Sequence, residues 1–139
     1  MTNLWCIRPS SLTPPHGANR KIKGGPLVDL AALQQAIRAS VITDGSVLVV
    51  NRSCDDYLEK LGWTEQHILD CLLCASPDDF RGSEWCDTSW AGKLPCDAYA
   101  VPYDEAGKRR VRGSLEYYLK FSIEEDTLRI QMVRAHLSP

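Results

Sequence analysis

Gly113-Ser-Leu-Glu-Tyr-Tyr-Leu-Lys-Phe-Ser-Ile123 alternates apolar and polar side chains from Leu115 onward, and this stretch decides the fold. Alternation with a period of two is typical of a β-strand that has one buried and one open face. A second run, Thr127-Leu-Arg-Ile-Gln-Met-Val-Arg-Ala-His136, follows the acidic turn Glu124-Glu125-Asp126. Two such runs so close together predict an antiparallel hairpin.

The two faces of this hairpin differ in chemistry. We expect the buried face to carry Leu115, Tyr117, Leu119, Phe121 and Ile123, continued in the second strand by Leu128, Ile130 and Met132. The open face then carries Glu116, Tyr118, Lys120 and Ser122 beside Arg129 and Gln131. A polar sheet face is often only a solvated surface. Here it also brings a tyrosine and a lysine together.

The length and composition of the whole chain favour one globular domain. It has 139 residues, of which 44% are hydrophobic and 24% are charged, and both fractions are ordinary for a soluble protein. No apolar run approaches the length of a membrane span, and the N-terminus lacks the apolar segment of a signal peptide. We therefore expect a cytoplasmic protein without a membrane partner.

The charge is spread unevenly along the chain. The net charge of −2 argues against nucleic-acid binding by bulk charge alone. The segment Cys54–Asp79 carries seven carboxylates against the single Lys60, whereas one short loop gathers Lys108, Arg109, Arg110 and Arg112. Local patches therefore matter more than the total charge.

Six cysteines raise the question of a metal site. Cys71-Leu-Leu-Cys74 has the spacing of a zinc or redox site, and His67, Cys86 or Cys96 offer further ligands. However, the pair lies in an apolar helical run and has no second C-x-x-C partner, and free cysteines are common in protein cores. We expect no metal, no other cofactor and no disulfide, and keep a small zinc protein as a weaker alternative.

The order of elements predicts an α+β fold. Residues 1–26 hold half of the prolines and several basic residues, so we expect an irregular N-terminal arm, with Leu4, Trp5 and Ile7 as anchors, before one domain at 27–139. The basic residues of this arm suit either a solvated tail or contact with a partner. We expect helices first and then at least three antiparallel strands, with the N-terminal helices packed on the C-terminal sheet.

Individual elements have recognisable start and stop signals. Asp29, Ser53 and Thr64 are expected to cap helices, the first ending near Ala39 and the second before Gly62. Ser76-Pro77-Asp78-Asp79 suits a short helical turn. We expect strands at Val47–Val50 and Cys96–Tyr103, and an ordered irregular loop at Phe80–Pro95.

Several short motifs from Ser53 onward occur in a distinctive order. They are Leu61-Gly62 with the amphipathic helix after it, Ser76-Pro77-Asp78-Asp79-Phe80 followed by Ser83, Cys96-Asp97-Ala98-Tyr99, Tyr118-Leu119-Lys120 and a final strand ending near His136. In this order the chain resembles the MqsR family of bacterial toxins, which are ribonucleases of type II toxin–antitoxin systems with a RelE-like fold. The resemblance covers roughly the last 85 residues, residues 1–26 having no counterpart.

The resemblance implies a reaction and two partners. Such toxins cleave single-stranded mRNA without metal, by attack of the ribose 2′-hydroxyl on the adjacent phosphate, and a cognate antitoxin protein holds them inactive. This chemistry needs a base, an acid and cations that stabilise the charge on the phosphorane.

The implied catalytic residues match this chain only in part. The family tyrosine falls on Tyr118, with Lys120 beside it, and the last family lysine falls near His136, with Arg134 as a competitor. Another family lysine falls on Gly82, where the adjacent cation is Arg81, and the family glutamine falls on Cys96. The resemblance therefore implies a variant catalytic set, which is Arg81, Tyr118, Lys120 and His136.

Other residues suit RNA binding. Lys108, Arg109, Arg110 and Arg112 suit phosphate contacts or a solvated loop, and four aromatic residues suit base stacking or core packing, namely Trp85, Trp90, Tyr99 and Tyr103. The alternative to an enzyme is a non-catalytic protein- or RNA-binding module on the same fold, which the glycine at position 82 favours.

Overall fold

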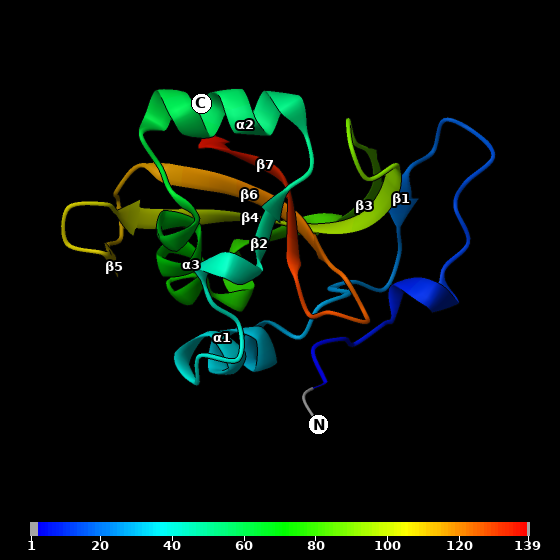
Figure 1. The fold of residues 1–139 in the computed structure, drawn as a ribbon, viewed down its shortest axis with the longest axis horizontal. Coiled ribbons are helices and arrows are strands. Elements are labelled where there is room, and N and C mark those ends of the chain that lie inside the picture. The colour runs from blue at the N-terminus through cyan, green and yellow to red at the C-terminus, as the bar shows by residue number, and fades with distance from the viewer. Residues whose placement is uncertain (1–2, 139) are drawn as a thin grey trace.

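The computed structural model describes residues 3–138 and has an α+β fold (Figure 1). This confirms the predicted fold class. Within this range the structure contains three α-helices, α1 Leu30–Arg38, α2 Arg52–Leu61 and α3 Glu65–Leu73. The strands are β1 Lys21–Ile22, β2 Val47–Val49, β3 Phe80–Asp87, β4 Lys93–Asp104, β5 Arg109–Arg110, β6 Glu116–Ile123 and β7 Ile130–Leu137.

The seven strands form one mixed sheet. The strand order is β1-β3-β4-β6-β7-β2, with β5 paired to β4 outside this path. The predicted hairpin is confirmed as β6 and β7, and β3, β4, β6 and β7 are antiparallel as expected. The sheet as a whole is mixed, because β2, which we expected as a strand, pairs in parallel with β7. A parallel pair needs a long crossover, and here the chain passes through α2, α3 and four other strands before it returns as β7.

The helices begin and end mostly where the sequence indicated, but α2 begins at Arg52 after the N-cap residue Asn51, so Ser53 lies inside the helix and is not the cap that we expected. The Asp29 carboxylate accepts a hydrogen bond from the Ala32 amide at 3.1 Å, and Gly62 ends α2 in the left-handed conformation at φ 70°. Thr64 caps α3 together with His67. α1 and α3 cover one face of the sheet, and α2 packs against β7 (Figure 1).

The N-terminal segment packs against the domain. The side chains of Leu4 and Trp5 belong to the main hydrophobic core, and Trp5 forms an antiparallel bridge with Val28. Further along, Lys21–Ile22 pairs with β3 as the outermost strand of the sheet. The segment is largely irregular, as expected, and the predicted boundary at residue 26 remains a prediction.

The segment Phe80–Asp87 is a strand rather than the irregular loop that we expected. It pairs with β4 along its whole length, but the register shifts between Phe80 and Gly82, so Arg81 is an extra residue in the ladder. Such a β-bulge interrupts the alternation of side chains. This interruption hid the strand in the sequence.

A second bulge changes the faces of β7. Lys120 pairs with Arg134 whereas Phe121 pairs with Met132, so Val133 is the extra residue. Strict alternation from Met132 would direct Arg134 and His136 into the core. The bulge instead brings both onto the face of β6 that carries Tyr118 and Lys120, since paired residues share a face.

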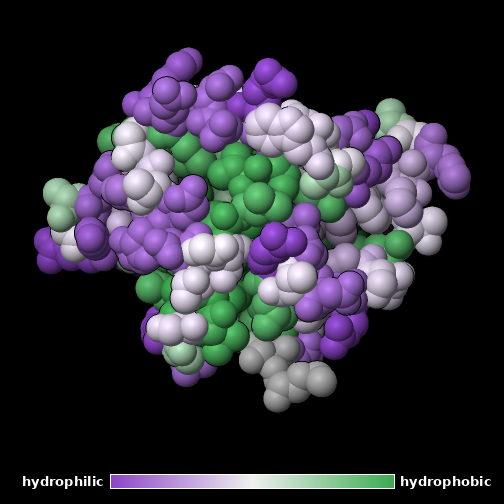
Figure 2. All heavy atoms as spheres, viewed as in Figure 1, coloured by the Kyte–Doolittle hydropathy of each residue, from purple (hydrophilic) through white to green (hydrophobic). Residues whose placement is uncertain are grey.

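The buried face of the hairpin largely follows the prediction. Tyr117, Leu119 and Phe121 pack in the main core, but Leu115 precedes β6 and is 66% exposed. Figure 2 shows hydrophobic atoms gathered on the surface below α2. Within residues 3–138, no helix is both long and apolar enough to cross a membrane.

Asp97 of β4 connects three distant parts of the chain. Its side chain is fully buried and accepts hydrogen bonds from the backbone amides of Leu27 and Val28 at 2.9–3.1 Å and from the Ser83 hydroxyl at 2.6 Å. Burial raises the pKa of this carboxyl, although these hydrogen bonds act in the opposite direction. Asp97 therefore fixes the segment before α1 and strand β3 onto β4.

Replacing Asp97 should destabilise the protein strongly. Asp97→Ala leaves three buried donors without their acceptor, so we expect the free energy of unfolding to fall by about 3–5 kcal/mol. Urea denaturation followed by circular dichroism measures the change. Asp87→Ala is the matched control, because its side chain is 62% exposed and its ion pairs should contribute less than about 1 kcal/mol. Equal losses for the two variants would contradict the role given to Asp97.

Candidate functional site

Three adjoining cavities lie along the face of the sheet that carries Tyr118 and Lys120. Their volumes are about 320, 290 and 360 Å³. The first shares Arg134 with the second and Glu84 with the third, so the three form one surface, which we call the basic groove. Strands β3, β4, β6 and β7 supply its floor, the N-terminal segment supplies one wall and α2 borders the end near His136.

The basic groove carries a strong excess of positive charge. Within residues 3–138, its lining includes six lysines and arginines against two carboxylates, namely Arg20, Lys21, Lys23, Arg81, Lys120 and Arg134 against Glu84 and Asp87. The whole chain has a net charge of −2. The fold therefore concentrates cations on one surface, and such a surface attracts phosphates or other anions.

Tyr118 and His136 form the centre of this groove. They face each other across β6 and β7, and their rings stack with centroids 5.1 Å apart and an interplanar angle of 19°. Tyr57 of α2 also packs against His136, with ring centroids 5.5 Å apart and an interplanar angle of 59°. The imidazole thus contacts two aromatic rings.

The tautomer of His136 follows from its hydrogen bond. Its Nδ1 lies 2.9 Å from the carbonyl oxygen of Leu137, which can only accept. Nδ1 therefore carries the proton in the neutral ring, and Nε2 is the basic nitrogen. An imidazole in this tautomer can accept a proton from a ligand through Nε2.

Lys120 lines the first cavity and is paired with Glu84. Its side chain is largely buried, and Nζ lies 5.7 Å from the centre of the Tyr118 ring. Burial lowers the pKa of this ammonium group, but the hydrogen bond to Glu84 and nearby negative groups outweigh burial and raise the pKa overall. Lys120 is therefore a fixed cation rather than a base.

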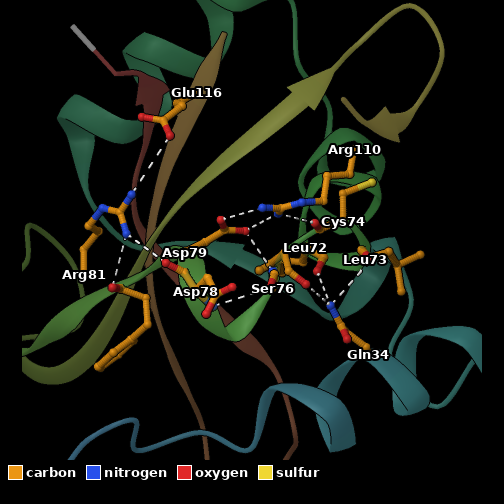
Figure 3. A network of polar contacts seen from close by, with 12 residues as sticks. Gln34, Leu72, Leu73, Cys74, Ser76, Asp78, Asp79, Arg81, Arg110 and Glu116 are labelled. Carbon is orange, nitrogen blue, oxygen red and sulfur yellow. Dashed lines mark hydrogen bonds and ion pairs between the residues drawn. The ribbon is translucent and has the colours of Figure 1, made fainter. Parts of the chain in front are cut away.

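Arg81 is the extra residue at the bulge in β3. It lines the same cavity as Tyr118, and its guanidinium donates hydrogen bonds to the carbonyl oxygens of Asp78 and Phe80 (Figure 3). An ion pair at 4.0 Å with Glu116 holds it loosely. The next residue, Gly82, has φ 116°, which L side chains rarely adopt, so a lysine at this position would strain the backbone.

The four predicted catalytic residues, Arg81, Tyr118, Lys120 and His136, therefore lie on one surface. Lys21, Lys23 and Tyr57 were not assigned to the site from the sequence. The arm's basic residues were noted as possible partner contacts, but their position beside β3 depends on the pairing of β1, for which Lys21–Ile22 is too short to give a signal. Arg134 had been named only as a competitor of His136.

The four basic residues of the predicted RNA-binding loop line none of the three cavities of the groove, and most of their charges are paired. Arg110 donates hydrogen bonds to the buried Asp79 carboxylate and to the Cys74 carbonyl oxygen, as Figure 3 shows. Lys108 lies 4.0 Å from Asp70, and Arg109 lies 3.9 Å from Asp104. Within residues 3–138, Arg112 has no ion pair. The structure thus gives Arg110 a structural contact, and the role of the loop in RNA binding stays a prediction.

The remaining candidates are mainly core residues. Trp85, Tyr99 and Tyr103 are buried, whereas Trp90 is exposed and packs beside Arg52. Cys71 is buried in α3, where burial raises the pKa of its thiol. In the part of the chain that the structure describes, no group of three or more His, Cys, Asp or Glu side chains is placed to hold a metal ion.

No protein-family model, curated protein or solved structure matches this chain. Its functional assignment therefore rests on the site itself.

The Arg110–Asp79 pair provides a stability test. Arg110→Ala leaves the buried Asp79 carboxylate without its cation, and we expect a loss of about 1–3 kcal/mol in unfolding free energy, since Arg110 itself is partly exposed. Arg112→Ala is the matched control and should change stability by less than about 0.5 kcal/mol. Thermal and urea unfolding measure both. A neutral Arg110→Ala variant would show that this contact does not stabilise the fold.

Proposed function

We propose that this protein is a metal-independent endoribonuclease that cleaves single-stranded RNA in the basic groove. The observation that supports this most is the excess of six cations over two carboxylates around the stacked Tyr118–His136 pair. RNA supplies both a phosphate chain for the cations and bases for the aromatic rings.

The proposed reaction uses the ribose 2′-hydroxyl as nucleophile. Nε2 of His136 accepts the proton of this hydroxyl as the oxygen attacks the adjacent phosphorus. Lys120 and Arg81 stabilise the negative charge that develops on the phosphorane. The Tyr118 hydroxyl donates its proton to the departing 5′-oxygen, which leaves a 2′,3′-cyclic phosphate and a free 5′-hydroxyl.

The biological setting is proposed from the order of motifs that resembles the MqsR family. In this proposal the fold is RelE-like, the substrate is mRNA in the cytoplasm, and the protein is the toxin of a type II toxin–antitoxin system. A cognate antitoxin protein would then hold the toxin inactive.

One observation favours a non-catalytic alternative. Gly82 has no side chain and a backbone conformation that disfavours lysine, while Lys120 is already paired with Glu84. A module that binds RNA through the same groove without cleaving it needs neither a second lysine nor a base. The two functions differ in whether RNA is cut after it binds.

Cleavage of a labelled single-stranded RNA in the presence of EDTA tests the proposal. We expect cleavage with cyclic-phosphate ends, and rates roughly 10²–10³-fold lower for His136→Ala, Tyr118→Phe and Arg81→Ala, because each removes a proton-transfer group or a stabilising cation. Arg38→Ala, at the end of α1, is the control and should keep full activity. Binding without cleavage would favour the non-catalytic module. Absence of RNA binding would exclude both functions.

Salt dependence tests the electrostatic part separately. Lys21 and Lys23 line the groove beside Arg81. Replacing either lysine with an uncharged residue should weaken RNA binding. It should also reduce the slope of log K against log salt concentration by about 0.7 for each phosphate contact that is lost. Fluorescence anisotropy with the same RNA measures this slope. An unchanged slope in both variants would show that the N-terminal segment does not contact the RNA phosphates.

A further inference from the structure

Two cysteines lie together on the floor of the basic groove. Cys86 of β3 pairs with Leu94, and Glu84 pairs with Cys96 of β4, so the two cysteines are diagonal neighbours on one face of an antiparallel pair. Both belong to a small apolar cluster with Val133. The proposed ribonuclease reaction uses neither thiol.

The two thiols differ in access. Cys96 is buried, and its thiol lies 3.5 Å from the carbonyl oxygen of Leu94. Cys86 is only partly buried and lines the cavity of about 320 Å³. A small reagent in this cavity therefore meets Cys86 first, with Cys96 directly behind it.

The surroundings of Cys86 favour its thiolate. A hydrogen bond from the Cys96 thiol lowers the pKa of Cys86 to about 7, against the opposing effect of burial, and Lys120 and Arg134 lower it further while Glu84 raises it. Arg20 and Asp87, one cation and one carboxylate, complete the charged groups around this cavity.

The other accessible cysteines lack these features. Cys6 is exposed and Cys74 partly exposed, yet the pKa of each is raised, in both cases with burial as the largest cause. They are internal controls that share the same solution and the same chain.

We propose that Cys86 and Cys96 form a reversible thiol-oxidation site within the basic groove, with a hydroperoxide as the oxidant. The Cys86 thiolate attacks the peroxide, its sulfur takes one oxygen to become a sulfenic acid, and hydroxide leaves. The Cys96 thiol then displaces the sulfenic hydroxyl, forming a disulfide, and its proton joins that hydroxyl as water. The proton that Cys86 lost on ionising neutralises the hydroxide of the first step. In total, two thiols lose two electrons and two protons, and hydrogen peroxide becomes two molecules of water.

This oxidation would act on the groove directly. Cys86 and Lys120 line the same cavity, so a disulfide there changes the charge and shape beside the Lys120–Glu84 pair. The oxidation itself does not depend on the proposed ribonuclease function, and its test measures only thiol chemistry.

Alkylation of the wild-type protein tests the reactivity of Cys86. At pH 7 a thiol with a pKa near 7 is about half ionised, against about 1% at pKa 9, and lower intrinsic nucleophilicity offsets part of this advantage. We expect Cys86 to react with iodoacetamide roughly 3–10-fold faster than Cys6, as measured by peptide mass spectrometry over a pH series. Slower labelling of Cys86 than of Cys6 at pH 7, or a midpoint near pH 9, would overturn the proposal.

Treatment with one equivalent of hydrogen peroxide tests the pair. In the wild type we expect a linked Cys86–Cys96 peptide that dithiothreitol separates again. In Cys96→Ser, dimedone should label the sulfenic acid at Cys86, whereas Cys74→Ser is the matched control and should still form the disulfide. Oxidation of Cys6 or Cys74 before Cys86 would contradict this assignment. So would a Cys86–Cys96 pair that stays reduced after peroxide treatment.

Discussion

The buried carboxylate of Asp97 is the interaction on which the site depends. It joins β3 to β4 through Ser83 and joins the start of the domain to the sheet through the amides of Leu27 and Val28. These hydrogen bonds hold the chain just after the part of the N-terminal segment that forms one wall of the basic groove, and they act together with the pairing of β1 with β3. A buried carboxylate is tolerated here because three donors replace the water that it loses.

Two β-bulges then decide which side chains enter the groove. One makes Arg81 an extra residue in β3, and the other makes Val133 an extra residue in β7, so that Arg134 and His136 share a face with Tyr118. Each bulge shifts the alternation by one residue, and a shift of one moves all later side chains to the opposite face. The bulge in β3 thus brings Glu84 to the groove beside Lys120, and the bulge in β7 brings His136 beside Tyr118.

The fold also decides where the charged side chains gather on the surface. The chain is slightly acidic, yet its basic groove draws cations from the N-terminal segment, β3, β6 and β7. The conspicuous cluster around Arg110 pairs largely with local carboxylates such as Asp79. The fold therefore gathers scattered cations on one surface, whereas most of the basic residues that are adjacent in the loop form ion pairs with nearby carboxylates.

The sequence by itself determined the α+β class, the helix caps at Asp29 and Thr64, and the β6–β7 hairpin with Tyr118 and Lys120 on one face. These features follow from local periodicity and capping chemistry, which depend on neighbours a few residues apart. The parallel pairing of β2 with β7, the bulges and the groove were decided only by tertiary structure. They depend on contacts between segments far apart in the chain, and no local pattern records which strands meet or where their registers shift.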